Sequence, residues 1–242
     1  MTFWIVMPCY NEEKRLPLSE IEYFLKLNTE TSILFVNDGS KDNTFGILKD
    51  FCKITNNAKF IDLLDNKGKA EAVRIGFLHI LAIDKNTSIG FADADLATPL
   101  QELVMLDNIL KSENKDFVFG SRWKRIGSVI ERNPFRHYFG RVFATIVSLM
   151  LNLPVYDTQC GAKVFSNTII KDIFNDPFIS PWFFDVEIFA RYINKFGEKK
   201  LFHKVLEVPL NNWIEKGDSR LGKLDFLKVP FELNRIRKKY KI

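Results

Sequence analysis

Ser88-Ile89-Gly90-Phe91-Ala92-Asp93-Ala94-Asp95 is an apolar run that ends in two carboxylates one residue apart. The run is typical of a buried strand, and the acids after it indicate a loop at the carboxyl end of that strand. Two acids in this position can hold a hard divalent cation between protein oxygens and the oxygens of a diphosphate. Acids also gather at strand ends because loops are solvated, so the motif alone leaves both interpretations open.

Outward from this strand, the first half of the chain alternates short apolar runs with helical patterns. We expect strands over residues 3–7, 32–36, 60–64, 89–92 and 117–120. We expect helices over residues 18–27, 44–54, 69–83 and 100–110. Strand followed by helix, repeated four times, predicts an α/β fold with a mostly parallel central sheet and helices on both faces.

Three polar clusters follow strands of this predicted sheet, at residues 8–13, 37–43 and 93–99. Ligands of parallel sheets bind outside the carboxyl ends of the strands. The clusters therefore converge on one crevice, which favours a metal site at Asp93 and Asp95. Within the second cluster, Asp38 suits an Asx turn or a helix cap, or else a carboxylate that accepts hydrogen bonds from a nucleoside.

The pattern changes after Arg122. We expect a basic loop, a long apolar helix from about Pro134, a strand near residues 162–165, a helix over 184–196, a strand over 201–210 and a basic helical tail. Neither an internal repeat nor a low-complexity linker interrupts the sequence. We therefore expect one domain over residues 1–242, with a first half at 1–125 and an elaborated second half at 126–242.

The composition is that of a globular protein with a basic end. The 242 residues carry a net charge of +5, and the 23 phenylalanines fit either an aromatic core or a lipid-facing surface. Cys9, Cys52 and Cys160 are widely spaced and favour a reduced, cytoplasmic setting. We expect no signal peptide and no spanning helix, because no apolar run reaches roughly 20 residues. The basic end would attract anionic lipid. Nucleic acid could also bind basic residues, but no other feature of the sequence supports it.

Four motifs in the first 125 residues resemble, in order and spacing, the family 2 glycosyltransferases. They are Ile5-Val6-Met7-Pro8-Cys9-Tyr10-Asn11-Glu12-Glu13, Val36-Asn37-Asp38-Gly39-Ser40-Lys41-Asp42-Asn43-Thr44, Asn66-Lys67-Gly68-Lys69 and Asp93-Ala94-Asp95. Later segments are similar to the polyprenyl-phosphate hexosyltransferase branch that includes dolichyl-phosphate glucosyltransferase. They are Gly120-Ser121-Arg122, Tyr156-Asp157-Thr158-Gln159-Cys160-Gly161, Trp182-Phe183-Phe184-Asp185-Val186-Glu187 and Val208-Pro209-Leu210-Asn211-Asn212-Trp213.

The resemblance implies a GT-A type fold and an inverting transfer of a hexose, glucose from UDP-glucose being the first expectation. On that basis the donor-binding residues are Pro8, Tyr10, Asn11, Glu12, Asp38, Lys69 and Asp93. Asp93 and Asp95 would hold Mg²⁺ or Mn²⁺, and Asp95, Asp157 and Asp185 would be the catalytic acids. The related mannose synthases usually have Gln two residues after the second acid, where this chain has Ala97, so a third metal ligand is not identified.

The residues themselves suggest where a phosphate acceptor would bind. Asn133-Pro134 is typical of a helix start, and free N–H groups there attract phosphate. Arg132 and Arg136 would flank this start, and the resemblance adds Ser121 and Arg122. The apolar segment at residues 139–153 that follows is either a buried core helix or an interfacial helix beside a polyprenyl chain.

A polyprenyl phosphate acceptor would change what catalysis requires. A phosphate monoester is already largely ionised at pH 7, whereas a sugar hydroxyl needs a general base. Asp157 and Asp185 would then orient a substrate, and with a hydroxyl acceptor in a surface polysaccharide one of them would be the base. A structural role, as a cap or in a pair with an arginine, is the alternative for both. A nucleotide-sugar-binding protein without turnover is a third alternative. We expect a peripheral protein on the cytoplasmic face of a membrane, bound to the lipid surface or to a separate membrane protein.

Overall fold

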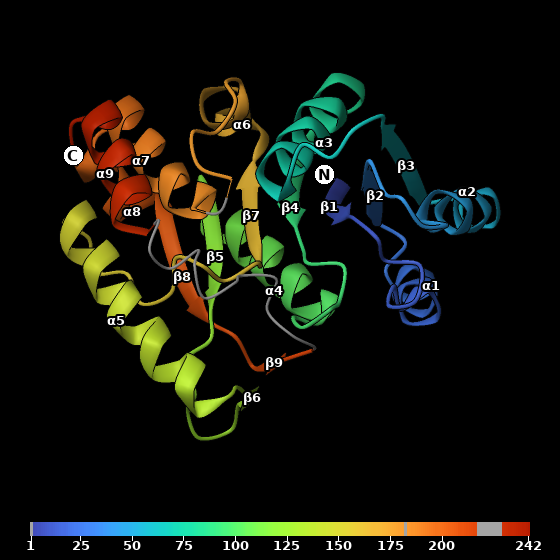
Figure 1. Cartoon of the computed structure of the whole chain (residues 1–242), viewed down its shortest axis with the longest axis horizontal. Helices are drawn as coiled ribbons and strands as arrows, with labels where there is room; N and C mark the ends of the chain where they lie inside the picture. The colour runs from blue at the N-terminus through green and yellow to red at the C-terminus, as the bar shows by residue number, and fades with distance from the viewer. Residues whose placement is uncertain (1, 182, 217–228) are drawn as a thin grey trace.

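The computed structural model describes residues 2–181, 183–216 and 229–242, and for residues 134–137 and 139 it describes the backbone alone. In these residues, seven strands form one sheet with the order β3-β2-β1-β4-β7-β5-β8 (Figure 1). The strands are β1 (Thr2–Cys9), β2 (Thr31–Asp38), β3 (Ala58–Leu63), β4 (Thr87–Phe91), β5 (Phe117–Ser121), β7 (Lys163–Ser166) and β8 (Val205–Pro209). All neighbours are parallel except β7, which runs antiparallel to β4 and β5.

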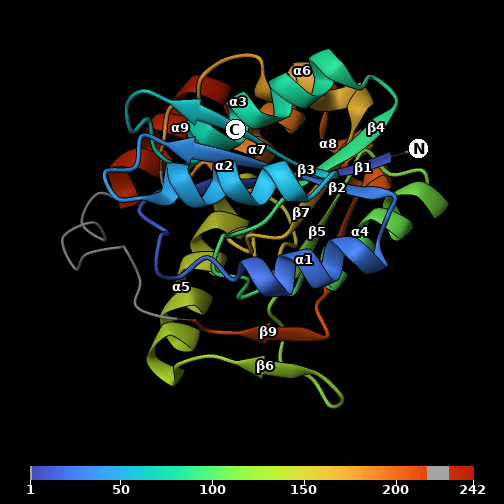
Figure 2. The ribbon, with the colours of Figure 1, turned by 90° about the vertical axis from the view of Figure 1, so that its right-hand side faces the viewer.

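Helices cover both faces of this sheet, as the alternating pattern predicted (Figure 2). One face carries α1 (Leu18–Leu27), α2 (Thr44–Ile54) and α4 (Leu100–Ser112). The opposite face carries α3 (Lys69–Ile83), α5 (Pro134–Leu151), α6 (Asn167–Phe174), α7 (Phe184–Phe196), α8 (Glu198–Lys204) and α9 (Val229–Tyr240). A short parallel pair, β6 (Val129–Glu131) and β9 (Asn212–Ile214), lies apart from the main sheet.

Alternating side chains of each strand enter the two cores. In β1, Trp4 and Val6 pack into one core, and Phe3, Ile5 and Met7 pack into the other. Many phenylalanines belong to the first core, where, for example, Phe77 and Phe174 stack with ring centroids 4.3 Å apart. These aromatic pairs favour the core interpretation for the buried phenylalanines.

The second half contains four elements that the sequence pattern did not predict: β6, α6, α8 and β9. Of these, α8 changes the bounds of an expected strand. The strand expected over residues 201–210 begins only at Val205, because α8 occupies Glu198–Lys204. Gly197 has a φ of +84°, which allows the chain to leave α7 and start a new helix at once. The run that follows is rich in Glu and Lys, which favour helix, and it buries only Leu201.

The antiparallel direction of β7 determines what lies at the functional edge. The parallel strands β1, β2, β4 and β5 end at the same edge, so the predicted clusters after β1, β2 and β4 lie there. Because β7 runs the opposite way, the chain that precedes it, residues 157–162, also lies at this edge. The sheet therefore brings segments from both halves of the chain to one place.

Candidate active site

The two acids after β4 stand in a tight turn at the carboxyl edge. Leu96 adopts a φ of +51°, and its N–H donates to the carbonyl of Asp93 at 3.1 Å. The N–H of Ala97 donates to Oδ1 of Asp95 at 2.9 Å. Lys69, the first residue of α3, places its Nζ 2.5 Å from Oδ1 of Asp93. The structure thus brings together Asp93, Asp95 and Lys69, as predicted.

The charges of this cluster suit a divalent cation. Burial, followed by the like charge of Asp93, raises the pKa of Asp95. Burial would lower the pKa of Lys69, but the charges of Asp93 and Asp185 outweigh it and raise that pKa. Carboxylate oxygens are ligands that Mg²⁺ and Mn²⁺ accept, and a cation would relieve the repulsion between Asp93 and Asp95. Within the described residues, no group of three or more His, Cys, Asp or Glu could hold a metal.

The loops after β1 and β2 are tied to each other. The N–H of Asn11 donates to Oγ of Ser40 at 3.0 Å, and the Asn11 side chain accepts from the N–H of Lys41 at 2.8 Å. The N–H of Glu12 donates to Oγ1 of Thr44 at 2.8 Å. Pro8 lies within β1, and Tyr10 is the first residue after this strand, in the loop that also contains Asn11 and Glu12. These contacts hold Asn11 and Glu12, two of the predicted donor-binding residues, against the loop after β2 at the carboxyl edge.

Asp38 anchors the chain that leads into α3. Its two carboxylate oxygens accept from the N–H of Lys67 at 2.7 Å and the N–H of Gly68 at 2.9 Å. Burial raises the pKa of Asp38, and these hydrogen bonds offset the effect in part. Asp38 therefore positions Lys69 whatever else it binds. The two donors lie 29 and 30 residues further along the chain, so these bonds are not the local Asx turn that the sequence would suit.

Arg122 and Asp157 form an ion pair, which is the arginine pairing that the sequence left open for Asp157 without identifying the partner. Nε and Nη2 of Arg122 lie 2.6 and 2.7 Å from the two carboxylate oxygens, and the Arg122 N–H adds a third hydrogen bond at 3.1 Å. Burial would raise the pKa of Asp157, but the charge and hydrogen bonds of Arg122 outweigh it and lower that pKa. Asp157 in this pairing is an ionised, fully engaged carboxylate, which is a poor general base.

Asp185 is paired as well. It lies in the first turn of α7, and its Oδ1 accepts from Nζ of Lys163 at 2.5 Å. The Lys163 side chain is 0% exposed and also donates to the carbonyl of Cys160 at 2.7 Å. Sequence reasoning missed Lys163, although a lone lysine in the apolar run Ala162-Lys163-Val164-Phe165 was a usable signal.

Arg132 differs from Arg122 in its surroundings. Its guanidinium forms no ion pair or hydrogen bond among the described residues. The group lies against Gly140 of α5. Burial, followed by the positive charge of Arg122, lowers the pKa of Arg132. Ser121 is buried at the end of β5, and the side chain of Arg136 lies outside the described residues. The carboxylates of Asp157 and Glu215 both act on Arg132, so an incoming anion would share this guanidinium with them.

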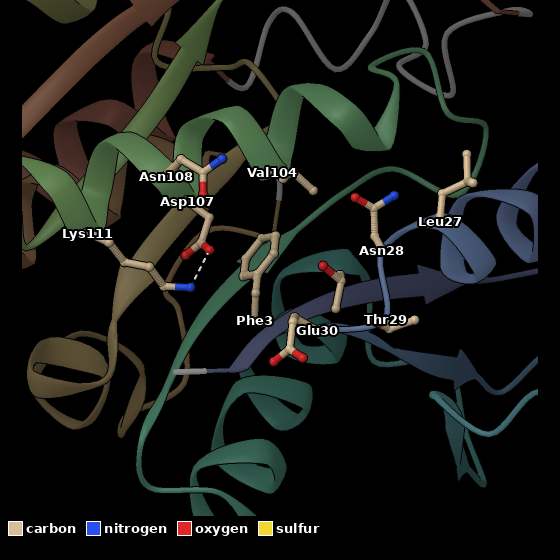
Figure 3. Close-up of a pocket in the computed structure, with 10 residues that line it drawn as sticks. Phe3, Leu27, Asn28, Thr29, Glu30, Val104, Asp107, Asn108 and Lys111 are labelled. Carbon is tan, nitrogen blue, oxygen red and sulfur yellow. Dashed lines mark hydrogen bonds and ion pairs between the residues drawn. The ribbon is translucent and has the colours of Figure 1, made fainter.

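The hollow drawn in Figure 3 lies elsewhere. It has a volume of about 290 Å³ and is bordered by Phe3, the chain after α1, and α4. Phe3 stands near the beginning of β1, so this hollow is at the amino-terminal edge of the sheet. Lys111 and Asp107, which line it, are already paired with each other. We therefore assign the site by the converging side chains at the carboxyl edge.

Comparison with known proteins identifies relatives of this chain. The model of the family described as "Glycosyl transferase family 2" matches residues 4–174. A dolichyl-phosphate beta-glucosyltransferase of Trichomonas vaginalis is 30% identical over 96% of this chain and 72% of its own length. The dolichyl-phosphate beta-glucosyltransferase of Saccharomyces cerevisiae is 31% identical over 98% of this chain and 74% of its own length.

Solved structures with the same fold include glucosyl-3-phosphoglycerate synthase from Mycobacterium tuberculosis. Its complex with Mn²⁺, UDP and phosphoglyceric acid has a TM-score of 0.69 and 16% identity, and the match covers 97% of this chain and 78% of that one. Its complex with Mg²⁺ and UDP has a TM-score of 0.66 and 18% identity, with coverage of 97% and 79%. The predicted GT-A type fold is confirmed.

Proposed function

The chain belongs to glycosyl transferase family 2, and from this membership we propose that it transfers a hexose from a nucleoside diphosphate sugar to a polyprenyl phosphate. Glucose from UDP-glucose is the proposed donor sugar, and dolichyl phosphate is the proposed type of acceptor. The donor half, residues 1–125, supplies Asp93, Asp95 and Lys69. The acceptor half, residues 126–242, supplies Arg132, Asp157 and Asp185.

One arrangement supports this proposal: two separate clusters of side chains could each bind a phosphate group. Lys69 and the pair Asp93/Asp95, with a divalent cation, suit a diphosphate. Arg122 and Arg132 interact electrostatically with each other, and Arg122 also interacts with Asp93. A second phosphate group beside Arg132 would thus lie close to the first, as a direct transfer between two phosphorylated substrates requires.

In the proposed reaction, an oxygen of the acceptor phosphate attacks the anomeric carbon of the hexose. The bond between that carbon and the diphosphate oxygen breaks, and the nucleoside diphosphate leaves with the electron pair. The new bond forms on the opposite face, so the configuration inverts. Lys69 would stabilise the departing diphosphate, and Arg132 would orient the attacking phosphate.

The engaged carboxylates support a phosphate acceptor over a sugar hydroxyl. A hydroxyl nucleophile must lose a proton, whereas a phosphate monoester with a second pKa near 6 is largely ionised at pH 7. Asp157 is held by Arg122 and Asp185 by Lys163, so neither stands ready to accept a proton. We assign both carboxylates to positioning, Asp157 for the arginines and Asp185 for the sugar side of the site.

Asp93 and Asp95 would hold Mg²⁺ or Mn²⁺ together with oxygens of the donor. When bound, the cation would neutralise charge on the departing diphosphate. Asp93, which pairs with Lys69, would then also contact the cation, and the N–H of Ala97 keeps Asp95 oriented. The backbone turn at Leu96 then determines the spacing of the two acids.

The outer face of α5 is proposed to meet the membrane that carries the acceptor. Tyr138, Val142, Ile146 and Leu149 recur at helical spacing and are 73%, 60%, 49% and 78% exposed. The opposite face buries Ala144, Val147 and Leu151. In the described part of the chain, no helix is long and apolar enough to cross a bilayer. An interfacial α5 would therefore bring the site to the lipid surface, on the cytoplasmic face in our proposal.

A direct assay tests the function. The protein is incubated with Mn²⁺, a panel of radiolabelled nucleotide sugars and a short polyprenyl phosphate, and lipid-linked sugar is extracted and identified. We expect a glucosylated lipid from UDP-glucose, and its loss on chelation of the metal. Release of UDP without lipid product, or preferential labelling of a free saccharide acceptor, would contradict the proposal.

A further inference from the structure

Two neighbouring residues at the site carry buried polar atoms without a recorded partner. Among the described residues, Oγ1 of Thr158 and Nε2 of Gln159 are buried and make no hydrogen bond. An unpaired buried N–H group costs free energy, because it has given up its hydrogen bonds to water without a replacement. Such groups call for a specific explanation, and a missing ligand oxygen is one.

Gln159 lies in the sequence between a residue of the proposed acceptor side and a residue of the proposed donor side. Two residues before it, Asp157 holds Arg122. Two residues after it, Gly161 lies against the carboxylate of Asp93. Two residues of chain span at most about 7 Å. The Cα of Gln159 is therefore within about 7 Å of the Cα atoms of both Asp157 and Gly161. The unpaired amide therefore belongs to the segment that joins the donor side to the acceptor side.

The group that must lie between these two sides is the hexose, since it moves from the diphosphate to the second phosphate. We propose that the side-chain amide of Gln159 donates a hydrogen bond to a hydroxyl oxygen of the transferred hexose and thereby contributes to the choice of sugar. This inference rests on the proposed function. A hydroxyl oxygen is a suitable acceptor for an amide N–H, and the bond would satisfy the buried group.

The test compares binding of UDP-glucose with binding of UDP, by calorimetry with Mn²⁺ and no acceptor. Gln159→Met keeps the size of the side chain and removes its amide. We expect the variant to bind UDP-glucose about tenfold more weakly, which corresponds to one good hydrogen bond, and UDP within about twofold of wild type. Donors that lack single hydroxyls then identify the contact: one of them should bind wild type and variant equally.

Stability provides an independent readout. Because the substitution removes an unsatisfied polar group, the melting temperature of Gln159→Met should rise by about 2–4 °C. Thr55→Val is the matched control, since the buried Thr55 hydroxyl also lacks a described partner but follows α2 at the opposite edge of the sheet. This control should leave both nucleotide affinities unchanged.

Equal weakening of UDP and UDP-glucose, or no weakening of either, would overturn the inference. A lower melting temperature would overturn it too, because it would reveal a structural partner for the amide. The experiment needs no polyprenyl phosphate, so absence of lipid transfer would count against the proposed function while selective loss of UDP-glucose binding still supports the role of Gln159.

Discussion

Oδ2 of Asp93 lies so close to Gly161 that a Cβ at position 161 would overlap it. This contact joins the end of β4 to the segment before β7, which come from different halves of the chain. It means that the position of one proposed metal ligand depends on the absence of a side chain nearly 70 residues away. Gly140 plays the same part for Arg132, since a Cβ there would lie 2.7 Å from Nη2.

Substitution of these two glycines should cause different defects, one in metal binding and the other in acceptor binding. Gly161→Ala should push the Asp93 carboxylate aside and weaken Mn²⁺ binding in the presence of UDP about tenfold. Gly140→Ala should instead displace the Arg132 guanidinium and raise the KM for polyprenyl phosphate, with Mn²⁺ binding unchanged. Calorimetry and steady-state kinetics on both variants check this. Equal effects on metal affinity would contradict the assignment.

Asp95→Asn should lower hexosyl transfer about 100-fold or more, because the amide lacks the charge that holds the cation. The affinity for Mn²⁺, measured by calorimetry with UDP, should fall in parallel. Asp50→Asn, on the exposed face of α2, is the control and should change neither quantity. Full transfer by Asp95→Asn would remove this residue from the metal site.

Arg132→Gln should raise the KM for polyprenyl phosphate about tenfold or more, which is the expected loss of one charged hydrogen bond. The affinity for UDP should stay the same, because Arg132 faces the acceptor side. Lys124→Gln, an exposed cation of the loop between β5 and β6, is the control for general loss of positive charge. If both variants weaken acceptor use equally, the effect is electrostatic attraction alone and no site at Arg132 is needed.

Asp157→Asn should reduce the free energy of unfolding by about 3 kcal/mol at pH 7, because it leaves Arg122 without its buried partner. The folded-state pKa of Asp157 lies below its usual value of 3.8. Its charge therefore stabilises the fold above the unfolded pKa, and that contribution is lost as the pH falls through the folded pKa. Urea unfolding of wild type and variant should show a gap that narrows below about pH 4. A gap independent of pH would contradict the ionised pair.

The double variant Val142→Glu, Leu149→Glu should lose binding to anionic vesicles, because it places charge on the exposed face of α5. Its fold should be unchanged, since both side chains face away from the core. Ile54→Glu, also on an exposed residue, is the matched control. Vesicle sedimentation measures the difference, and undiminished binding of the double variant would point to another anchor, such as a membrane-protein partner.

Local pattern was sufficient to predict most elements. The helix expected over residues 184–196 is α7, Phe184–Phe196, and the helix expected from Pro134 begins there. Both have clear apolar periodicity. The pair β6 and β9 was not predicted, because strands of three residues carry too little pattern and are defined by pairing with a distant segment.

The sequence was sufficient to predict which residues lie at the candidate site, but not which of them form ion pairs with each other. Asp93, Asp95 and Lys69 converge as expected because parallel strands end at one edge. The pairs Arg122–Asp157 and Lys163–Asp185 join residues 35 and 22 positions apart, and no local signal records which cation meets which acid. The same holds for the antiparallel placement of β7 between β4 and β5.

That placement of β7 also constrains how the protein is made. β4 and β5 are not neighbours in the sheet; each pairs with β7, whose last residue is Ser166. While the chain emerges from the ribosome, β5 therefore has no strand beside it until about 45 further residues have been synthesised. The donor half can reach its final arrangement only after the start of the acceptor half has emerged, so translation through residue 166 is a minimum for assembling the nucleotide-sugar site.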